Sequence, residues 1–216
     1  MKIAVIGATG FVGKSITNEL TNRNHTVTGI ARNVTPADQP NLTMVSVDIL
    51  NSSELAETLK GNDVVVSAFN AGWENPNLYN DFIAGSKAIQ EAVKLAGVER
   101  YIVIGGAGSL YVAEDVQAVD TPDFPKEIYP GASAARDYLN LLKEEENELD
   151  WVFFSPAFEM HQGITTGRTG KYRLGKDTPV FDENNRSVLS VEDLAVVIAN
   201  EVEQPKHHKT RFTAAY

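Results

Sequence analysis

Three glycines spaced three residues apart are the strongest chemical signal in the sequence, because this spacing can hold the phosphates of a nucleotide. The run Gly7-Ala8-Thr9-Gly10-Phe11-Val12-Gly13 follows the short apolar segment Ile3–Ile6 and opens an amphipathic segment. Gly7 would permit a tight turn, Gly10 would let the backbone approach a pyrophosphate, and Gly13 would let a helix pack closely on a sheet. The free amides and the dipole at the start of that helix attract negative charge. Ordinary tight turns also contain glycines, but the position between an apolar run and a helix favours a dinucleotide-binding turn.

The end of the second apolar segment bears on which dinucleotide would bind. The sequence there reads Ile30-Ala31-Arg32-Asn33 and lacks the Asp or Glu that commonly accepts hydrogen bonds from the 2′-hydroxyl of an NAD ribose. The planar guanidinium of Arg32 matches a 2′-phosphate, which a carboxylate would repel. We therefore predict a preference for NADP(H) over NAD(H); the alternative is that Arg32 is a solvated surface residue. Asp48 would lie beside the adenine ring or, alternatively, cap a helix.

Alternating strands and helices would bring these groups to one edge of a sheet. Short apolar runs predict strands at residues 3–6, 26–31, 42–47, 63–68, 101–104, 151–154, 186–189 and 211–215. Amphipathic runs predict helices at residues 11–23, 52–59, 78–96, 132–148 and 191–203. Ser52 or Ser53 would cap the second helix, and Gly97 would end the third. This rhythm predicts one α/β domain over residues 1–216, with a Rossmann-type, doubly wound parallel sheet and helices on both faces.

Two stretches interrupt the alternation. Residues 106–130 are rich in Pro, Asp and Gly, which predicts a long functional loop. The elements after Pro156 are short and include a Gly-rich stretch. We therefore expect residues 156–190 to form a small C-terminal substrate-side region, or cap.

The composition excludes several classes of function. The formal net charge is -10, which argues against a broad surface for nucleic acid or anionic membranes. Cysteine is absent, so disulfides, thiolate metal sites and cysteine nucleophiles are excluded. We expect the pair His207-His208 to lack nearby carboxylate or cysteine partners, and we therefore expect no metal site. No apolar run approaches the roughly 18 residues of a membrane span, and we expect a cytoplasmic protein of undetermined oligomeric state.

With the glycine motif, Arg32 and Asp48, the chain resembles the atypical short-chain dehydrogenase/reductase families. Within them it is similar to the NmrA-like group of NADH-flavin reductases, relatives of biliverdin-IXβ/flavin reductase. The further segments that carry this resemblance are Gly105–Leu110, Asp123–Pro125, Ser155–Ala157, Gly167–Arg173, Ser190–Ala195 and Arg211–Thr213.

The resemblance implies further contacts with a nicotinamide cofactor after the fourth, fifth and sixth predicted strands. Ala68 and Phe69 would lie beside the cofactor ribose, and Gly105 and Gly106 would lie near the nicotinamide. The segment Ser155-Pro156-Ala157 would meet the carboxamide. These places agree with the rule that ligands of such sheets bind outside the carboxyl ends of the strands.

The acid–base pair of ordinary short-chain dehydrogenases is missing. Those enzymes use Tyr-x-x-x-Lys, in which the lysine lowers the pKa of the tyrosine. Here Tyr138 is followed four positions later by Leu142, and neither Tyr129 nor Tyr111 has a lysine at that spacing. Alcohol dehydrogenation and sugar epimerisation therefore lose their usual base. Hydride transfer to a flavin or quinone needs none, because the protein need only stack two rings and exclude water.

Four side chains are candidates for the acceptor site. Trp73 and Tyr111 could form an apolar wall for a flavin or quinone ring, or pack onto the domain surface. His161 could supply a proton to the reduced acceptor, or be a solvated loop histidine. Ser109 could orient a carbonyl, or satisfy the backbone of its own loop.

Two functions are compatible with these features. The first is an NAD(P)H-dependent oxidoreductase that transfers hydride from NADPH to a flavin, a quinone or a similar conjugated acceptor. The alternative is a catalytically inactive, NmrA-like regulatory protein that senses NADP(H) and acts through a protein partner. A reductase would have an aromatic-lined acceptor pocket, whereas a sensor would expose an apolar patch. Lys171 and Arg173 could attract a flavin phosphate to such a pocket, or serve only the solubility of the surface.

Overall fold

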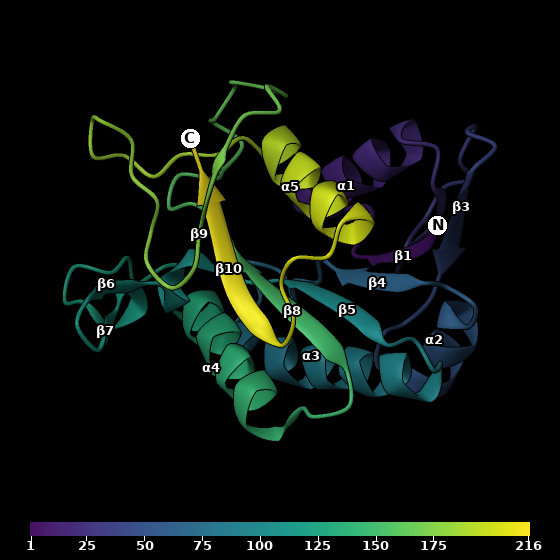
Figure 1. The fold of residues 1–216 in the computed structure, drawn as a ribbon. Coiled ribbons are helices and arrows are strands. Elements are labelled where there is room, and N and C mark those ends of the chain that lie inside the picture. The colour runs from purple at the N-terminus through teal and green to yellow at the C-terminus, as the bar shows by residue number, and fades with distance from the viewer.

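Seven parallel strands and one antiparallel strand form the central sheet of the computed structural model, which describes residues 1–216 (Figure 1). The strands of the sheet are β1 (Lys2–Ile6), β2 (Thr26–Ala31), β3 (Leu42–Ser46), β4 (Val64–Ser67), β5 (Arg100–Ile104), β8 (Asp150–Ser155), β9 (Arg173–Gly175) and β10 (Thr210–Ala215). The helices are α1 (Phe11–Asn22), α2 (Ser52–Leu59), α3 (Leu78–Leu95), α4 (Tyr129–Glu145) and α5 (Val191–Glu203). The strand order is β3-β2-β1-β4-β5-β8-β10-β9, and only β9 runs antiparallel to its neighbour. The predicted Rossmann-type fold is confirmed.

Helices cover both faces of the sheet and separate two hydrophobic cores (Figure 1). Helices α2, α3 and α4 enclose one core, which includes Tyr101 and Phe153, while α1 and α5 enclose the other, which includes Phe154. Neighbouring residues of a strand point to opposite faces, so Phe153 and Phe154 enter different cores. Because both faces are covered, the central strands β1, β4, β5 and β8 read as largely apolar runs. None of the helices combines the length and apolar composition that a membrane crossing requires.

The cap of α2 and the start of α4 differ from the prediction. Asn51, rather than Ser52 or Ser53, caps α2, because its side-chain oxygen accepts a hydrogen bond from the Glu54 amide at 3.3 Å. Helix α4 starts at Tyr129, three residues earlier than predicted. Pro130 lies in its first turn, where the amide that proline lacks would have no partner within the helix.

The chain after β8 shows the largest departure from the prediction. The predicted strand at residues 186–189 is wrong, because Val188 forms only an isolated bridge with Glu159. The antiparallel neighbour of β10 is instead the three-residue strand β9. By contrast, Gly97 follows α3 with a φ of 70°, as predicted for a residue that ends a helix.

The interrupted stretch after β5 contains short elements of its own. The 3₁₀ helix η1 (Ala107–Ser109) precedes a hairpin of β6 (Tyr111–Ala113) and β7 (Val116–Gln117), and the 3₁₀ helix η2 (Ala118–Asp120) follows. In Figure 1 this hairpin lies at the left, on the side where β8 and β10 end. The loop is therefore at the edge of the sheet where ligands of this fold bind.

Candidate functional site

The glycine turn brings β1, β4 and α1 close together. Gly7 has a φ of 80° and donates its amide to the Ile30 carbonyl at 2.8 Å. A Cβ at Gly7 would lie 2.6 Å from the Ala68 carbonyl oxygen, and a Cβ at Gly13 only 2.1 Å from the Gly7 carbonyl oxygen. No other residue type fits these two approaches, which is the packing role predicted for Gly7 and Gly13.

The turn also leaves a row of backbone donors without acceptors. The amides of Thr9, Phe11, Val12 and Gly13 make no hydrogen bond within the protein, whereas the Gly10 amide donates to the Gly7 carbonyl at 3.0 Å. Three of these amides open α1, so the helix dipole adds to their attraction for an anion. The arrangement fits a pyrophosphate.

The strand ends form one continuous edge beside this turn. Residue pairing aligns β1 with β4, β4 with β5 and β5 with β8. As a result Gly7, Ala68, Gly105 and Ser155, each at or just beyond the end of its strand, follow one another across the carboxyl edge. The strand order reverses at β1, and this reversal is where doubly wound sheets bind their ligands.

The two predicted adenosine contacts lie on the other side of the turn. Arg32 directly follows β2, is exposed, and forms no ion pair with any carboxylate of the protein. Asp48 is also exposed, and its Oδ1 accepts a hydrogen bond from the Leu50 amide at 3.0 Å. The helix-capping alternative for Asp48 is wrong, since Asn51 caps α2. A contact of Asp48 with adenine stays a prediction.

Several residues of the carboxyl edge pack against the core beneath it. The ring of Phe69 stacks on Phe82 with centroids 5.9 Å apart. A Cβ at Gly105 would lie 1.9 Å from the Phe153 ring, so the absence of a side chain at Gly105 leaves room for this ring. Pro156 and Ala157 are buried. Gly106 is partly exposed and precedes η1.

Ser109 and Ser155 form a fully buried hydroxyl pair. Their Oγ atoms are 3.1 Å apart, and Ser109 Oγ also donates to the Gly106 carbonyl at 3.1 Å. This geometry favours the structural alternative for Ser109, in which its hydroxyl satisfies the loop backbone. The pair links the loop after β5 to the end of β8.

A buried arginine that sequence reasoning did not single out holds the same loop. Arg211 is 1% exposed, and its guanidinium donates to the Ser109 carbonyl at 2.5 Å and to Asp177 Oδ1 at 2.5 and 3.0 Å. The guanidinium carbon also lies 5.5 Å from the centroid of the Tyr111 ring. An arginine in strand β10, directly before Phe212, was the only sequence signal of this role. Its partners lie 34 and 102 residues away in the chain.

The predicted acceptor-site aromatics contact different parts of the molecule. Trp73 is 61% exposed and lies against Gly131 near the start of α4, where a Cβ would be 2.8 Å from the indole. Tyr111 begins β6, and its amide donates to the Asp177 carbonyl at 2.8 Å. His161 is exposed, and its Nδ1 accepts a hydrogen bond from the Gly163 amide at 3.1 Å. No contact in the structure joins Trp73 and Tyr111 into one wall.

Tyr138 is buried in the core and is not available as an acid or base at the carboxyl edge. Its side chain is fully buried, and its hydroxyl donates to Gln90 Oε1 at 3.0 Å and lies 3.5 Å from the Tyr101 hydroxyl. Burial raises the pKa of Tyr138 well above its usual range and the pKa of Tyr101 to about 12. Both tyrosines therefore stay protonated inside the core at neutral pH.

The two C-terminal histidines have carboxylate partners that the sequence does not place beside them. His207 Nδ1 lies 2.8 Å from Glu201, and His208 Nδ1 lies 3.0 Å from Asp150. The view that this pair lacks carboxylate partners was therefore wrong. No three His, Cys, Asp or Glu side chains converge on a position for a metal ion.

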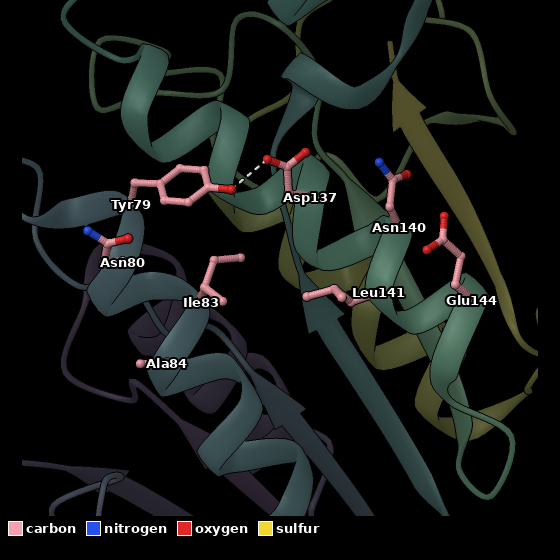
Figure 2. Close-up of a pocket in the computed structure, with 8 residues that line it drawn as sticks. All are labelled: Tyr79, Asn80, Ile83, Ala84, Asp137, Asn140, Leu141 and Glu144. Atoms are coloured by element: carbon pink, nitrogen blue, oxygen red, sulfur yellow. Dashed lines mark hydrogen bonds between the residues drawn. The ribbon is translucent and has the colours of Figure 1, made fainter.

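Two surface hollows accompany these features. One, of about 350 Å³, lies between α3 and α4, where the Tyr79 hydroxyl donates to Asp137 Oδ2 at 2.7 Å above Ile83 and Leu141 (Figure 2). This hydrogen bond raises the pKa of Tyr79, since the carboxylate stabilises the protonated phenol. None of the residues that line this hollow between α3 and α4 lies at the end of a strand. The other, of about 610 Å³, lies beside the β6–β7 hairpin.

Comparison with known proteins agrees with this geometry. Residues 7–205 match the family model described as NAD(P)H-binding, and the chain belongs to this family. It is 35% identical over 215 residues to the uncharacterized protein YwnB of Bacillus subtilis, covering 99% of this chain and 97% of that protein. The family supports a nicotinamide dinucleotide as the cofactor of this chain.

Solved structures show the same fold over the whole chain. A Bacteroides thetaiotaomicron protein named a "putative epimerase" is 42% identical with a TM-score of 0.90, covering 100% of this chain and 96% of that one. A Streptococcus pneumoniae protein named a "putative NADH-flavin reductase" is 34% identical with a TM-score of 0.85, covering 100% and 99%. These similarities confirm the resemblance to the atypical, NmrA-like short-chain dehydrogenase/reductases.

Proposed function

We propose that the protein is an NADPH-dependent reductase whose acceptor is a flavin, a quinone or a similar conjugated molecule. The observation that carries the proposal is the burial of Tyr138, the tyrosine of α4 nearest to the missing Tyr-x-x-x-Lys pattern. With this hydroxyl buried in the core, α4 offers no Tyr-x-x-x-Lys pair for acid–base chemistry. Hydride transfer between stacked rings remains, because it depends on positioning and on exclusion of water.

Each part of the cofactor has residues suited to hold it. The free amides from Thr9 to Gly13 would bind the pyrophosphate, and Arg32 would bind the 2′-phosphate. Gly105, Gly106 and the segment Ser155–Ala157 would flank the nicotinamide from the ends of β5 and β8. A bound NADPH supplies the hydride. The name of the Streptococcus pneumoniae relative supports an acceptor of the flavin type.

The test is NADPH consumption by the purified protein with FMN, riboflavin and a simple quinone offered in parallel. Protein-free samples correct for the slow direct reaction, and cofactor binding is measured in the same preparations. Turnover with at least one acceptor is the expected result. Tight NADPH binding without turnover across the panel would contradict the reductase and favour the NADP(H)-sensing alternative.

Replacing Arg32 with alanine is expected to weaken NADPH binding about tenfold to a hundredfold, the usual value of hydrogen bonds to a charged group. NADH lacks the 2′-phosphate, so its dissociation constant should change less than about twofold. Isothermal titration of both cofactors measures the difference. Lys60→Ala is the matched control, because Lys60 pairs with Glu57 on α2 and its loss removes the same charge. Equal losses for both cofactors would refute the role of Arg32.

A further inference from the structure

The groove beside the β6–β7 hairpin has two walls from distant parts of the chain. Residues 111–115 form one wall, and Thr178, Pro179 and Phe181 form the other; we call this hollow the hairpin groove. The Tyr111 amide joins the walls by donating to the Asp177 carbonyl at 2.8 Å. Arg211 also contacts this junction, because its Nε donates to Asp177 Oδ1 at 3.0 Å.

The hairpin groove belongs to the carboxyl edge of the sheet. Tyr111 lies two residues after Ser109, whose Oγ is 3.1 Å from Ser155 Oγ at the end of β8. Three residues beyond Ser155, Phe158 packs edge-on against Phe181 with ring centroids 6.2 Å apart. In Figure 1 the hairpin and the segment after β9 lie together on the side where β8 and β10 end. The groove is thus placed on the acceptor side of the proposed nicotinamide position.

Apolar and aromatic surface dominates the walls. Val112 is 44% exposed and Phe181 is 40% exposed, with Tyr111 and Pro179 beside them. Phe158, also 40% exposed, extends this surface from the end of β8. Exposed aromatic faces of this kind suit a planar conjugated ring, which can stack on them.

The charged side chains that line the groove are both acidic. Ala113 pairs with Val116, so Glu114 and Asp115 are the two turn residues of the hairpin. Asp115 has a φ of 56°, a conformation that Asp and Asn tolerate better than most residues. The turn therefore holds two carboxylates at the rim.

Two arginines near the groove do not offset these carboxylates, because they are engaged elsewhere. Lys176 is exposed two residues before Thr178 but does not line the groove. Arg211 is buried and paired with Asp177. Arg173 uses its guanidinium to donate to the carbonyl oxygens of Phe181 and Tyr216. Neither arginine lines the groove.

We propose that the hairpin groove binds the acceptor and selects an uncharged planar ring over an anionic one. The proposal rests on the reductase function above and specifies its substrate class as a neutral flavin or quinone. Riboflavin and FMN are a matched pair for this choice, because FMN adds only a phosphate of nearly two negative charges at neutral pH. The carboxylates of Glu114 and Asp115 would repel that phosphate.

The test is a fluorescence titration of riboflavin and of FMN with the NADP⁺-loaded protein at low salt. Riboflavin is expected to bind at least about tenfold more tightly than FMN, and the ratio should shrink in high salt, which screens exposed charges. The double variant Glu114→Gln, Asp115→Asn should improve FMN binding at least about threefold and leave riboflavin unchanged. Glu145→Gln is the control, because it removes the same kind of charge at the far end of α4.

A second variant tests the aromatic wall. Phe181→Ala removes a partly exposed ring from the groove wall, and it should weaken riboflavin binding about fivefold while NADP⁺ binding stays unchanged. Equal or tighter binding of FMN, or an equal effect of Glu145→Gln, would overturn the selection. These titrations need no turnover. If the protein binds riboflavin selectively but does not oxidise NADPH, the proposed reductase function would be refuted and the proposed selectivity of the hairpin groove would stand.

Discussion

Replacing Gly13 with alanine is expected to abolish NADPH binding and to lower the free energy of unfolding by about 3 kcal/mol. By helix propensity alone the change would stabilise α1 by about 1 kcal/mol. The clash outweighs this gain, because the new Cβ would lie 2.1 Å from the Gly7 carbonyl oxygen, which is backbone and cannot rotate away. Helix α1 would have to move from the sheet and carry its free amides with it. Thermal unfolding should shift down by roughly 6–12 °C.

Gly61→Ala is the matched control for this prediction. Gly61 has a φ of 75°, and a Cβ there would meet nothing within 4 Å. The substitution therefore adds backbone strain of about 1 kcal/mol without a clash, and NADPH binding should remain. If Gly13→Ala bound NADPH as the wild type does, the close approach of α1 would not be a condition of cofactor binding.

The pair of Arg211 and Asp177 should respond asymmetrically to substitution. Asp177→Ala is expected to cost about 2–3 kcal/mol, because it leaves the buried guanidinium without its carboxylate. Arg211→Met should cost less, about 1–2 kcal/mol, since the side chain of Asp177 is 55% exposed and can be hydrated. The Ser109 carbonyl would also keep its hydrogen bond from Gln117 Nε2 at 2.9 Å.

Urea unfolding of both single variants and the double variant measures this asymmetry. The double variant should resemble Arg211→Met, because no charge is then left in the interior. Arg186→Ala, which breaks an exposed pair with Glu159, should leave the unfolding midpoint unchanged. Equal costs for the two single variants would show that the Arg211 side chain is hydrated when Asp177 is absent.

The alternation of elements could be predicted because the central strands β1, β4, β5 and β8 are buried on both faces, whereas α1, α2, α3 and α4 each have an exposed face. β2 and α5 have the predicted bounds. β9 could not be predicted, since three residues carry no periodicity and their pairing depends on β10, which lies 35 residues further along the chain. The hairpin of β6 and β7 could not be predicted either, because its strands are three and two residues long and lie in a stretch rich in Pro, Asp and Gly.

In the candidate site too, residues whose role depends on local geometry could be predicted, and residues whose role depends on distant contacts could not. The glycines of the turn could be found from the sequence, because their role depends on local backbone geometry. The place of Arg32 directly after β2 could be predicted for the same reason, while its contact with a 2′-phosphate stays a prediction. The contacts of Ser109, Asp177 and Arg211 could not, because these residues come from three separate segments that meet only in the folded protein.

Strand β10 has a consequence for how the protein is made. It follows every other strand in the chain, yet it lies inside the sheet between β8 and β9. A nascent chain that has released β1 to β9 therefore exposes the unpaired backbone of β8 and has no partner for β9. The first five parallel strands can assemble during translation, while the region around the hairpin groove must wait for Arg211 to leave the ribosome. During synthesis, folding of the acceptor side therefore follows folding of the nucleotide-binding side.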